Sequence, residues 1–251
     1  MTSARELRVR SVDGLPEIER GADLGSLIAD LGEPREGEIV VVSQKIVSKA
    51  EGRIRRLSEV EPGARAREVA AATDKDPALV ELALSESSSV VRAEPGVLIV
   101  ATRGGWVCAN AGIDSSNLAG DDLVALLPED ADASARAIRK VIRARTGFAP
   151  AVVIADSFGR PWRLGQTDVA IGCAGLAPLD DWRGRADAHG RELAATVIAD
   201  ADQLAAAADL VRDKDSGTPV AIVAGLEGLV TAGDGPGARA IQRPREDDLF
   251  R

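Results

Sequence analysis

This chain of 251 residues contains few of the residue types from which common catalytic centres are built. It has no tyrosine, one histidine (His189) and two cysteines, Cys108 and Cys173. Two cysteines cannot form a disulfide framework or a four-cysteine zinc site, which fits a reducing cytoplasm. A zinc site made of several histidines is excluded, and so is a Ser-His-Asp triad that does not use His189.

Basic residues are outnumbered by acidic ones. The sequence has 31 Lys+Arg and 40 Asp+Glu, which gives a formal net charge of −9. This balance argues against a general nucleic-acid or anionic-membrane binder, because such proteins hold phosphate through basic patches. A small anionic ligand held by a local basic cluster or by metal ions remains compatible with it. The start of the chain has no apolar signal-peptide core and no apolar run reaches about 18 residues, so we expect a cytoplasmic protein without a membrane span.

The common phosphate-binding loops are missing as well. There is no G-x-x-x-x-G-K-[ST] motif, and no strand is followed by G-x-G-x-x-G. The composition is otherwise that of an ordinary soluble globular protein, with 45% hydrophobic and 28% charged residues. We expect one domain over residues 1–251, with room for two lobes.

Short apolar runs and helical patterns follow one another without a regular βαβα rhythm, which favours an α+β fold over a doubly wound sheet. Ser134 is expected to cap a helix that runs to residue 146, and the apolar run 151–155 is expected to end as a strand at Asp156. The other predicted strands cover residues 38–43, 96–102, 106–108 and 219–223, and the other predicted helices cover 61–73, 77–86 and 196–212.

A first candidate site is the polar, glycine-bearing loop NAGIDSSN at residues 110–117. Asp114 lies in it, next to Ser115, Ser116 and Asn117. A short carboxylate among other oxygen-bearing side chains suits a hard cation. The alternative is an Asx-turn or a helix N-cap made by Asp114 or Asn117.

A second candidate site is DSFGRPWRLG at residues 156–165, directly after an apolar strand. The carboxylate of Asp156 and the hydroxyl of Ser157 could share one Mg²⁺ or Mn²⁺ that also bridges phosphate oxygens. Arg160 and Arg163 follow and could neutralise phosphate or carboxylate. The alternative is a capped turn with solvated arginines.

Two further charged segments are less specific. Lys45 and Lys49 lie four residues apart after the run 38–43, and Lys49 could reach a phosphate, although a strand end with solvated lysines is the alternative. The segment DDWRGRADAHGRE at residues 180–192 is dense in both charges and is typical of a surface ion-pair loop. We expect His189 within it to be a surface or interface residue.

The residues therefore provide two carboxylates on separate segments, several cations, and no histidine or cysteine machinery. That combination favours metal-assisted phosphoryl chemistry, in which positioning and charge neutralisation do most of the work. It does not identify a substrate.

Four blocks together resemble, in their order and spacing, the coenzyme F420:L-glutamate ligase family. The resemblance runs from about residue 12 to the C-terminal tail. The blocks are VVSQKIVSKAEGR (41–53), VCANAGIDSSN (107–117), ADSFGRPWRLGQTDVAIGCAG (155–175), and DDWRGRADAHGREL with TVIADADQLAAAADLV (180–211).

The resemblance implies an enzyme that adds L-glutamate to the deazaflavin precursor of coenzyme F420. It would use GTP, two divalent metal ions (Mg²⁺ or Mn²⁺) and a monovalent cation such as K⁺, form γ-linked glutamyl amides, and release GDP and phosphate. The implied fold is an unusual mixed-sheet α+β ligase fold in an intertwined homodimer. Small molecules would be its only substrates, with no nucleic acid or membrane partner.

The resemblance also implies roles for individual residues. Asp114 and Asp156 would bind metal, together with Ser157, which stands where the family more often has threonine. Lys214 falls near a place where some members offer a carboxylate, so we expect no third carboxylate ligand there. Lys49, Arg160 and Arg163 are the candidate catalytic cations. The implied nucleotide contacts are Leu15, Pro16, Glu17, Ile18, Ser43, Gln44, Lys49, Asn117 and, from the loop 212–218, Lys214.

Other functions remain open on the sequence. One is a related amide ligase that acts on another acid, and a second is a non-catalytic protein that binds GTP or metal. A third is a metal-dependent phosphoester hydrolase. Some actinobacterial members of the family carry a second, flavin-reductase-like domain, so this chain is either a stand-alone ligase or the ligase domain of such a protein.

Overall fold

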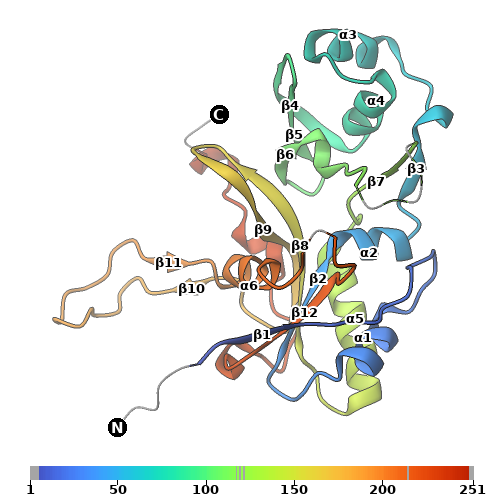
Figure 1. The fold of residues 1–251 in the computed structure, drawn as a ribbon. Coiled ribbons are helices and arrows are strands. Elements are labelled where there is room, and N and C mark those ends of the chain that lie inside the picture. Colours follow the sequence, from blue (N-terminus) through green and yellow to red (C-terminus); the bar gives the residue numbers. More distant parts are fainter. Residues whose placement is uncertain (1–5, 117, 119, 121, 214, 249–251) are drawn as a thin grey trace.

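A mixed five-stranded sheet forms the centre of the molecule (Figure 1). The computed structural model describes residues 6–116, 118, 120, 122–213 and 215–248. The order of strands in the sheet is β1-β12-β2-β8-β9, and only β2 and β8 are parallel among its neighbouring pairs. Its strands are β1 (Arg8–Ser11), β2 (Ile39–Ser43), β8 (Ala151–Arg160), β9 (Arg163–Ala174) and β12 (Val220–Ala224).

Helices cover both faces of this sheet. Helices α1 (Leu24–Gly32) and α5 (Ala131–Thr146) pack on one face, and α6 (Asp200–Asp209) packs on the other. The apolar run of β2 serves both layers, because successive side chains of a strand point to opposite faces. Val40 and Val42 lie in the core under α1 and α5, whereas Ile39 and Val41 lie in the core under α6.

A smaller lobe is inserted between β2 and α5 (Figure 1). Its own core joins helices α3 (Ala64–Thr73) and α4 (Pro77–Ser85) to a three-stranded sheet. That sheet contains β4 (Ser87–Glu94), β5 (Val97–Thr102) and β6 (Val107–Ala109). The pair β3 (Ile54–Arg56) and β7 (Leu123–Ala125) connects the lobe to helix α2 (Gln44–Ala50) and to α5.

A two-stranded arm projects from the body of the molecule (Figure 1). It contains β10 (Asp180–Asp181) and β11 (Val197–Ile198), joined by a long loop. Single turns of 3₁₀-helix complete the described structure at Leu57–Glu59, Asn110–Gly112, Glu227–Leu229, Ala238–Ile241 and Arg245–Asp247. No helix in the described part of the chain is long and apolar enough to cross a membrane.

The α+β expectation is confirmed, and most predicted elements are present within a few residues of their expected bounds. One strand end was wrong: β8 does not stop at Asp156 but continues to Arg160 in a long hairpin with β9. One cap was also wrong, because Asp130 rather than Ser134 accepts the hydrogen bond from the first turn of α5, at Ala133. Strands β1 and β4 were not predicted; their mixed polar sequences belong to partly exposed strands without a clear apolar face.

Candidate functional site

One edge of the central sheet gathers segments that lie far apart in the sequence. Strand β2 runs parallel to β8 and places Ser43 opposite Ala155, the residue before Asp156. Because parallel strands end at the same edge, the start of α2 lies next to Asp156. The sheet therefore places the start of the segment 156–165 next to the segment that carries Lys45 and Lys49.

The antiparallel strands bring two more segments to the same edge. The Ser43 amide donates a hydrogen bond to the Pro219 carbonyl at 2.8 Å, so the loop 212–219 ends beside the start of α2. The Val12 amide donates to the Val220 carbonyl at 2.9 Å, which places the segment that follows β1 there as well. Residues 12–18, 43–49, 156–157, 212–213 and 215–219 thus converge.

The residues with implied nucleotide contacts differ in their burial and in the contacts that they make. Lys49 Nζ lies 2.6 Å from Glu17 Oε1, and this ion pair ties the segment 15–18 to α2. Pro16 is exposed and Leu15 and Ser43 are half-buried, whereas Ile18 belongs to the core. Gln44 is buried, and its side-chain oxygen accepts a hydrogen bond from Ser48 Oγ at 2.9 Å. Asn117 and Lys214 lie outside the described residues.

Asp114 approaches the sheet edge from the smaller lobe. Its carboxylate Oδ2 lies 2.8 Å from Lys45 Nζ, and its Oδ1 accepts a hydrogen bond from the Ser116 amide at 2.7 Å. The second contact confirms the Asx-turn, which leaves the carboxylate beside a lysine of α2. Burial opposes ionisation, but hydrogen bonds from Lys45 and Ser116 prevail and lower the pKa of Asp114.

Asp156 has the opposite electrostatic environment. Burial raises the pKa of its carboxyl group to about 7, and the charges of Asp168 and Asp114 act in the same direction. The Ser157 amide and Lys45 oppose this shift without cancelling it. The charges of Asp168 and Asp114 thus both disfavour ionisation of Asp156, and a bound cation would oppose their effect.

The donor set fits a hard cation in part. Asp114 and Asp156 supply carboxylate oxygens, the ligands that Mg²⁺ prefers. No group of three His, Cys, Asp or Glu side chains in the described part of the chain could by itself hold a metal ion. Mg²⁺ commonly binds one or two carboxylates and completes its coordination with water and substrate phosphates, so two carboxylates match that mode.

Ser157 belongs to a buried polar network on strand β8. Its hydroxyl donates a hydrogen bond to Asp168 Oδ1 at 2.6 Å, and Asp168 also pairs with Arg212. Both members of that ion pair are only 6% exposed at the side chain, and Arg212 Nε is buried without a hydrogen-bond partner in the described structure. Asp168 and Arg212 thus connect β8 and β9 with the loop that precedes β12.

The structure does not bring Arg160 and Arg163 to the two carboxylates of the same chain. They lie at the exposed tip of the β8–β9 hairpin, where Arg160 Nη2 donates to the Leu164 carbonyl at 2.8 Å. Arg160 is four residues beyond Asp156, roughly 13 Å along a strand. The expectation that the strand ends at Asp156 was therefore wrong, and the longer strand places both arginines at the far end of the hairpin.

The segment 180–192 is a surface loop with local ion pairs, as its charge pattern indicated. Arg183 pairs with Asp181 at 2.6 Å, and Arg185 pairs with Asp180 at 2.8 Å. His189 is exposed in the same loop, so it lies at the surface. Cys108 and Cys173 are both free and buried.

Sequence reasoning missed three charged residues of the site. Lys45 was noticed only as half of a lysine pair, yet it is the one that contacts Asp114. Asp168 and Arg212 received no role of their own, although Asp168 lies in the recognisable block 155–175. Asp168 directly precedes the apolar half of its strand, and the register of the β8–β9 hairpin places it opposite Ser157.

Comparison with known proteins assigns a family to this arrangement. A family profile described as "F420-0:Gamma-glutamyl ligase" matches residues 14–225. The chain is 44% identical to the "Coenzyme F420:L-glutamate ligase" of Methanopyrus kandleri over 98% of both sequences. It is 45% identical to the protein of that name from Methanothermobacter thermautotrophicus, over 96% of this chain and 97% of the relative. The protein of that name from Haloarcula marismortui is 44% identical, over 98% of this chain and 96% of the relative. Because both kinds of match cover most of the chain, the protein belongs to the F420-0:gamma-glutamyl ligase family.

Proposed function

We propose that this protein is a GTP-dependent coenzyme F420:L-glutamate ligase, which adds L-glutamate to the deazaflavin precursor and extends it through γ-linked glutamates. Family membership supports the reaction class. The observation that carries the proposal is the convergence of Asp114, Asp156 and Lys45 at one sheet edge. Crowded carboxylates beside a lysine are suited to a metal-bound nucleotide.

The proposed reaction has two steps. A precursor carboxylate oxygen attacks the γ-phosphorus of GTP, the bond to the β-phosphate oxygen breaks, and GDP leaves with the electron pair. The glutamate nitrogen then attacks the acyl phosphate carbon, and phosphate leaves with the bonding pair as the amide forms and a proton is lost from nitrogen. The first step is needed because a carboxylate does not condense with an amine at neutral pH.

Two divalent ions, Mg²⁺ or Mn²⁺, would be held by Asp114, Asp156 and Ser157, with K⁺ as an additional cation. When bound, they would neutralise the phosphate oxygens during transfer. Lys45 keeps Asp114 ionised by donating a hydrogen bond to it, so the carboxylate is ready to act as a ligand. Asp168 fixes the Ser157 hydroxyl, and Arg212 balances the charge of Asp168.

The nucleotide is proposed to lie across the converging segments. Lys49 would bind a phosphate as a point charge, in exchange for its pairing with Glu17. The other proposed contacts are Leu15, Pro16, Glu17, Ile18, Ser43, Gln44, Asn117 and Lys214.

We also propose that the chain acts as a homodimer. The β10–β11 arm projects from the body, and an isolated two-stranded ribbon is only marginally stable in water (Figure 1). A second copy would cover this arm. It would also give Arg160 and Arg163, at the exposed hairpin tip, a route to phosphate or acidic substrate in the partner's site.

Phosphate release from GTP tests the ligase proposal. Reactions would contain Mg²⁺ or Mn²⁺, with L-glutamate and the unglutamylated precursor added separately and together, and products would be identified by mass spectrometry. We expect release that requires both substrates and is matched by addition of one or more glutamyl units.

The alternatives give different results in the same assay. A phosphoester hydrolase would release phosphate without an amine, and a regulatory protein would bind GTP without forming product. A ligase for another acid would form product only when the precursor is replaced. Light scattering coupled to gel filtration tests the dimer, since a monomer at assay concentration would contradict it.

A further inference from the structure

A cavity of about 330 Å³ lies between the two lobes, outside the set of residues assigned to the nucleotide and metals. Its walls come from the β5–β6 hairpin, the loop after β7, the start of α5, strand β9 and the 3₁₀ turn at Ala238–Ile241. This volume is within the range of small-molecule pockets. Charged residues on its walls include Arg53, Glu86, Arg103, Glu129, Asp130 and Arg239.

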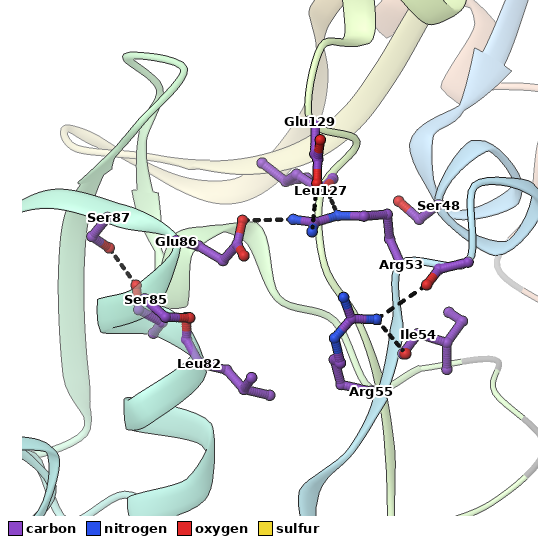
Figure 2. Close-up of polar contacts among 12 residues, drawn as sticks. Ser48, Arg53, Ile54, Arg55, Leu82, Ser85, Glu86, Ser87, Leu127 and Glu129 are labelled. Carbon is purple, nitrogen blue, oxygen red and sulfur yellow. Dashed lines mark hydrogen bonds and ion pairs between the residues drawn. The ribbon is translucent and has the colours of Figure 1, made fainter. Parts of the chain in front are cut away.

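One of the three arginines is already neutralised. Arg53 lies between two carboxylates, with Nη2 at 2.6 Å from Glu86 and Nη1 at 3.4 Å from Glu129 (Figure 2). Its Nε donates a hydrogen bond to the Leu127 carbonyl at 3.0 Å. Arg53 therefore fixes the cavity wall, and its charge is not available for a ligand.

The other two arginines differ from Arg53 in this respect. Within the described residues, the guanidinium groups of Arg103 and Arg239 form neither a hydrogen bond nor an ion pair, and both residues are exposed. Arg103 comes from the turn of the β5–β6 hairpin, and Arg239 comes from the C-terminal segment. A guanidinium group can hold a carboxylate through two parallel hydrogen bonds, so this cavity offers places for two carboxylates.

Acidic groups lie on the same cavity. Glu129 has a side chain that is 81% exposed, although one oxygen faces Arg53 at 3.4 Å. Asp130 uses Oδ1 to cap α5 at Ala133, which leaves the other oxygen for a further contact. These oxygens could accept hydrogen bonds from an ammonium group. The cavity therefore combines two guanidinium groups with two carboxylates.

The cavity adjoins the proposed reaction site. Ile171 lines it and forms a bulge between the pairs Ala155–Ala170 and Ile154–Gly172 on the hairpin that carries Asp156. Ala111, in a left-handed conformation with φ 58°, also lines it, three residues before Asp114. Ala111 is thus three residues from Asp114 along the chain, and Ile171 is next to the pair Ala155–Ala170, where Ala155 directly precedes Asp156.

We propose that this cavity binds the amino-acid substrate, an α-amino dicarboxylate, with Arg103 and Arg239 holding its two carboxylates and Glu129 and Asp130 facing its ammonium group. The assignment rests on the proposed function, because only an acceptor amine gives this occupant a role.

The test compares Arg103→Gln, Arg239→Gln and the double variant with the wild-type protein. Each single variant is expected to raise KM for L-glutamate roughly tenfold or more, since a hydrogen bond to a charged group is lost. KM for GTP and for the precursor should stay within about twofold. Arg67→Gln on α3 is the matched control, because it removes the same charge from an exposed position outside the cavity.

Calorimetric titration with L-glutamate provides a readout that does not need turnover. We expect binding that the double variant loses and that L-glutamine, which lacks one carboxylate, does not reproduce. Unchanged KM for L-glutamate in an active double variant would overturn the cavity assignment and leave the ligase proposal intact. A wild-type protein that makes no product would contradict the ligase proposal. In that case, glutamate binding that depends on the two arginines would still support the cavity assignment. Absence of glutamate binding would overturn the cavity assignment.

Discussion

Lys45 of α2 and Asp114 of the smaller lobe form an ion pair across the sheet edge, with 2.8 Å between Nζ and Oδ2. The lysine side chain is 15% exposed and the aspartate 35%, so the contact is partly shielded from water. The pair connects the two lobes at the place where the proposed metal and nucleotide site lies.

Replacing this lysine should therefore impair the reaction more than the fold. Lys45→Met is expected to lower kcat for glutamate addition by roughly 100-fold, the order found when one preorganised electrostatic group is removed. Lys140→Met, at an exposed position of α5, is the control and should stay near the wild-type rate. A Lys45→Met protein with normal kcat would show that Asp114 does not depend on its partner.

The electrostatic strain at Asp156 predicts a pH-dependent gain in stability on substitution. Its pKa is raised from 3.8 to about 7, so the folded state holds the proton more tightly than the unfolded state. The stabilisation from this proton is present below pH about 4 and is lost as the pH rises through about 7. Asp156→Asn resembles the protonated form at every pH.

Thermal unfolding in EDTA at pH 5 and pH 8 measures this effect. The variant should gain most over the wild type at pH 8, where the wild-type carboxylate is charged. With Mn²⁺ and GDP added, only the wild type should be stabilised, because binding to the folded state raises its stability. Equal differences in Tm at both pH values would contradict the electrostatic origin.

Arg139 of α5 lies outside the candidate site, and we expect the stability of the fold to depend on it. Its side chain is 6% exposed and contacts Asp234 at 2.7 Å, the Pro150 carbonyl at 2.9 Å and the Thr231 carbonyl at 2.7 Å. Arg139→Met should lower the free energy of unfolding by about 2–4 kcal/mol, since it removes the hydrogen bonds that a buried guanidinium group donates to the Pro150 and Thr231 carbonyls and to Asp234. Arg143→Met on the exposed face of the same helix should change it by less than about 0.5 kcal/mol. Urea denaturation of both variants measures these two changes in the free energy of unfolding.

Gly172 predicts a steric limit in strand β9. A Cβ at this position would lie 2.4 Å from the Ala131 carbonyl carbon and oxygen at the start of α5. Gly172→Ala should destabilise the protein by about 1–3 kcal/mol, because the helix must shift to admit the methyl group. Gly159→Ala on the same hairpin meets nothing within 4 Å and is the control. Equal Tm values for the two variants would contradict this packing.

Most of the fold could be predicted from the apolar patterns in the sequence. The polar strands could not be predicted in this way. The run 39–42 is buried on both faces and is recognisable from composition alone. Strand β8 was cut short at Asp156 because its second half is polar, and only the pairing with β9 keeps it extended. Pairing between distant segments is a tertiary effect that local propensity does not encode.

The candidate site, like the fold, could be predicted from the sequence only in part. Asp114 and Asp156 were predicted as metal ligands from the polar segments around them and from family resemblance, and the structure places both near Lys45. Arg160 and Arg163 lie farther from Asp156 than predicted, because β8 continues to Arg160 instead of ending at Asp156. The cavity between the lobes could not be predicted, because Arg103 and Arg239 are 136 residues apart and meet through the packing of the two lobes.

The most direct measurement follows oxygen from the precursor carboxylate into phosphate. The precursor would be labelled with ¹⁸O in its carboxylate and incubated with GTP, Mg²⁺ and L-glutamate, and both products would be examined by mass spectrometry. The account predicts a glutamylated product and phosphate that carries one ¹⁸O, because the acyl phosphate breaks between carbon and that oxygen. Phosphate without ¹⁸O, or no glutamylated product at all, would contradict it.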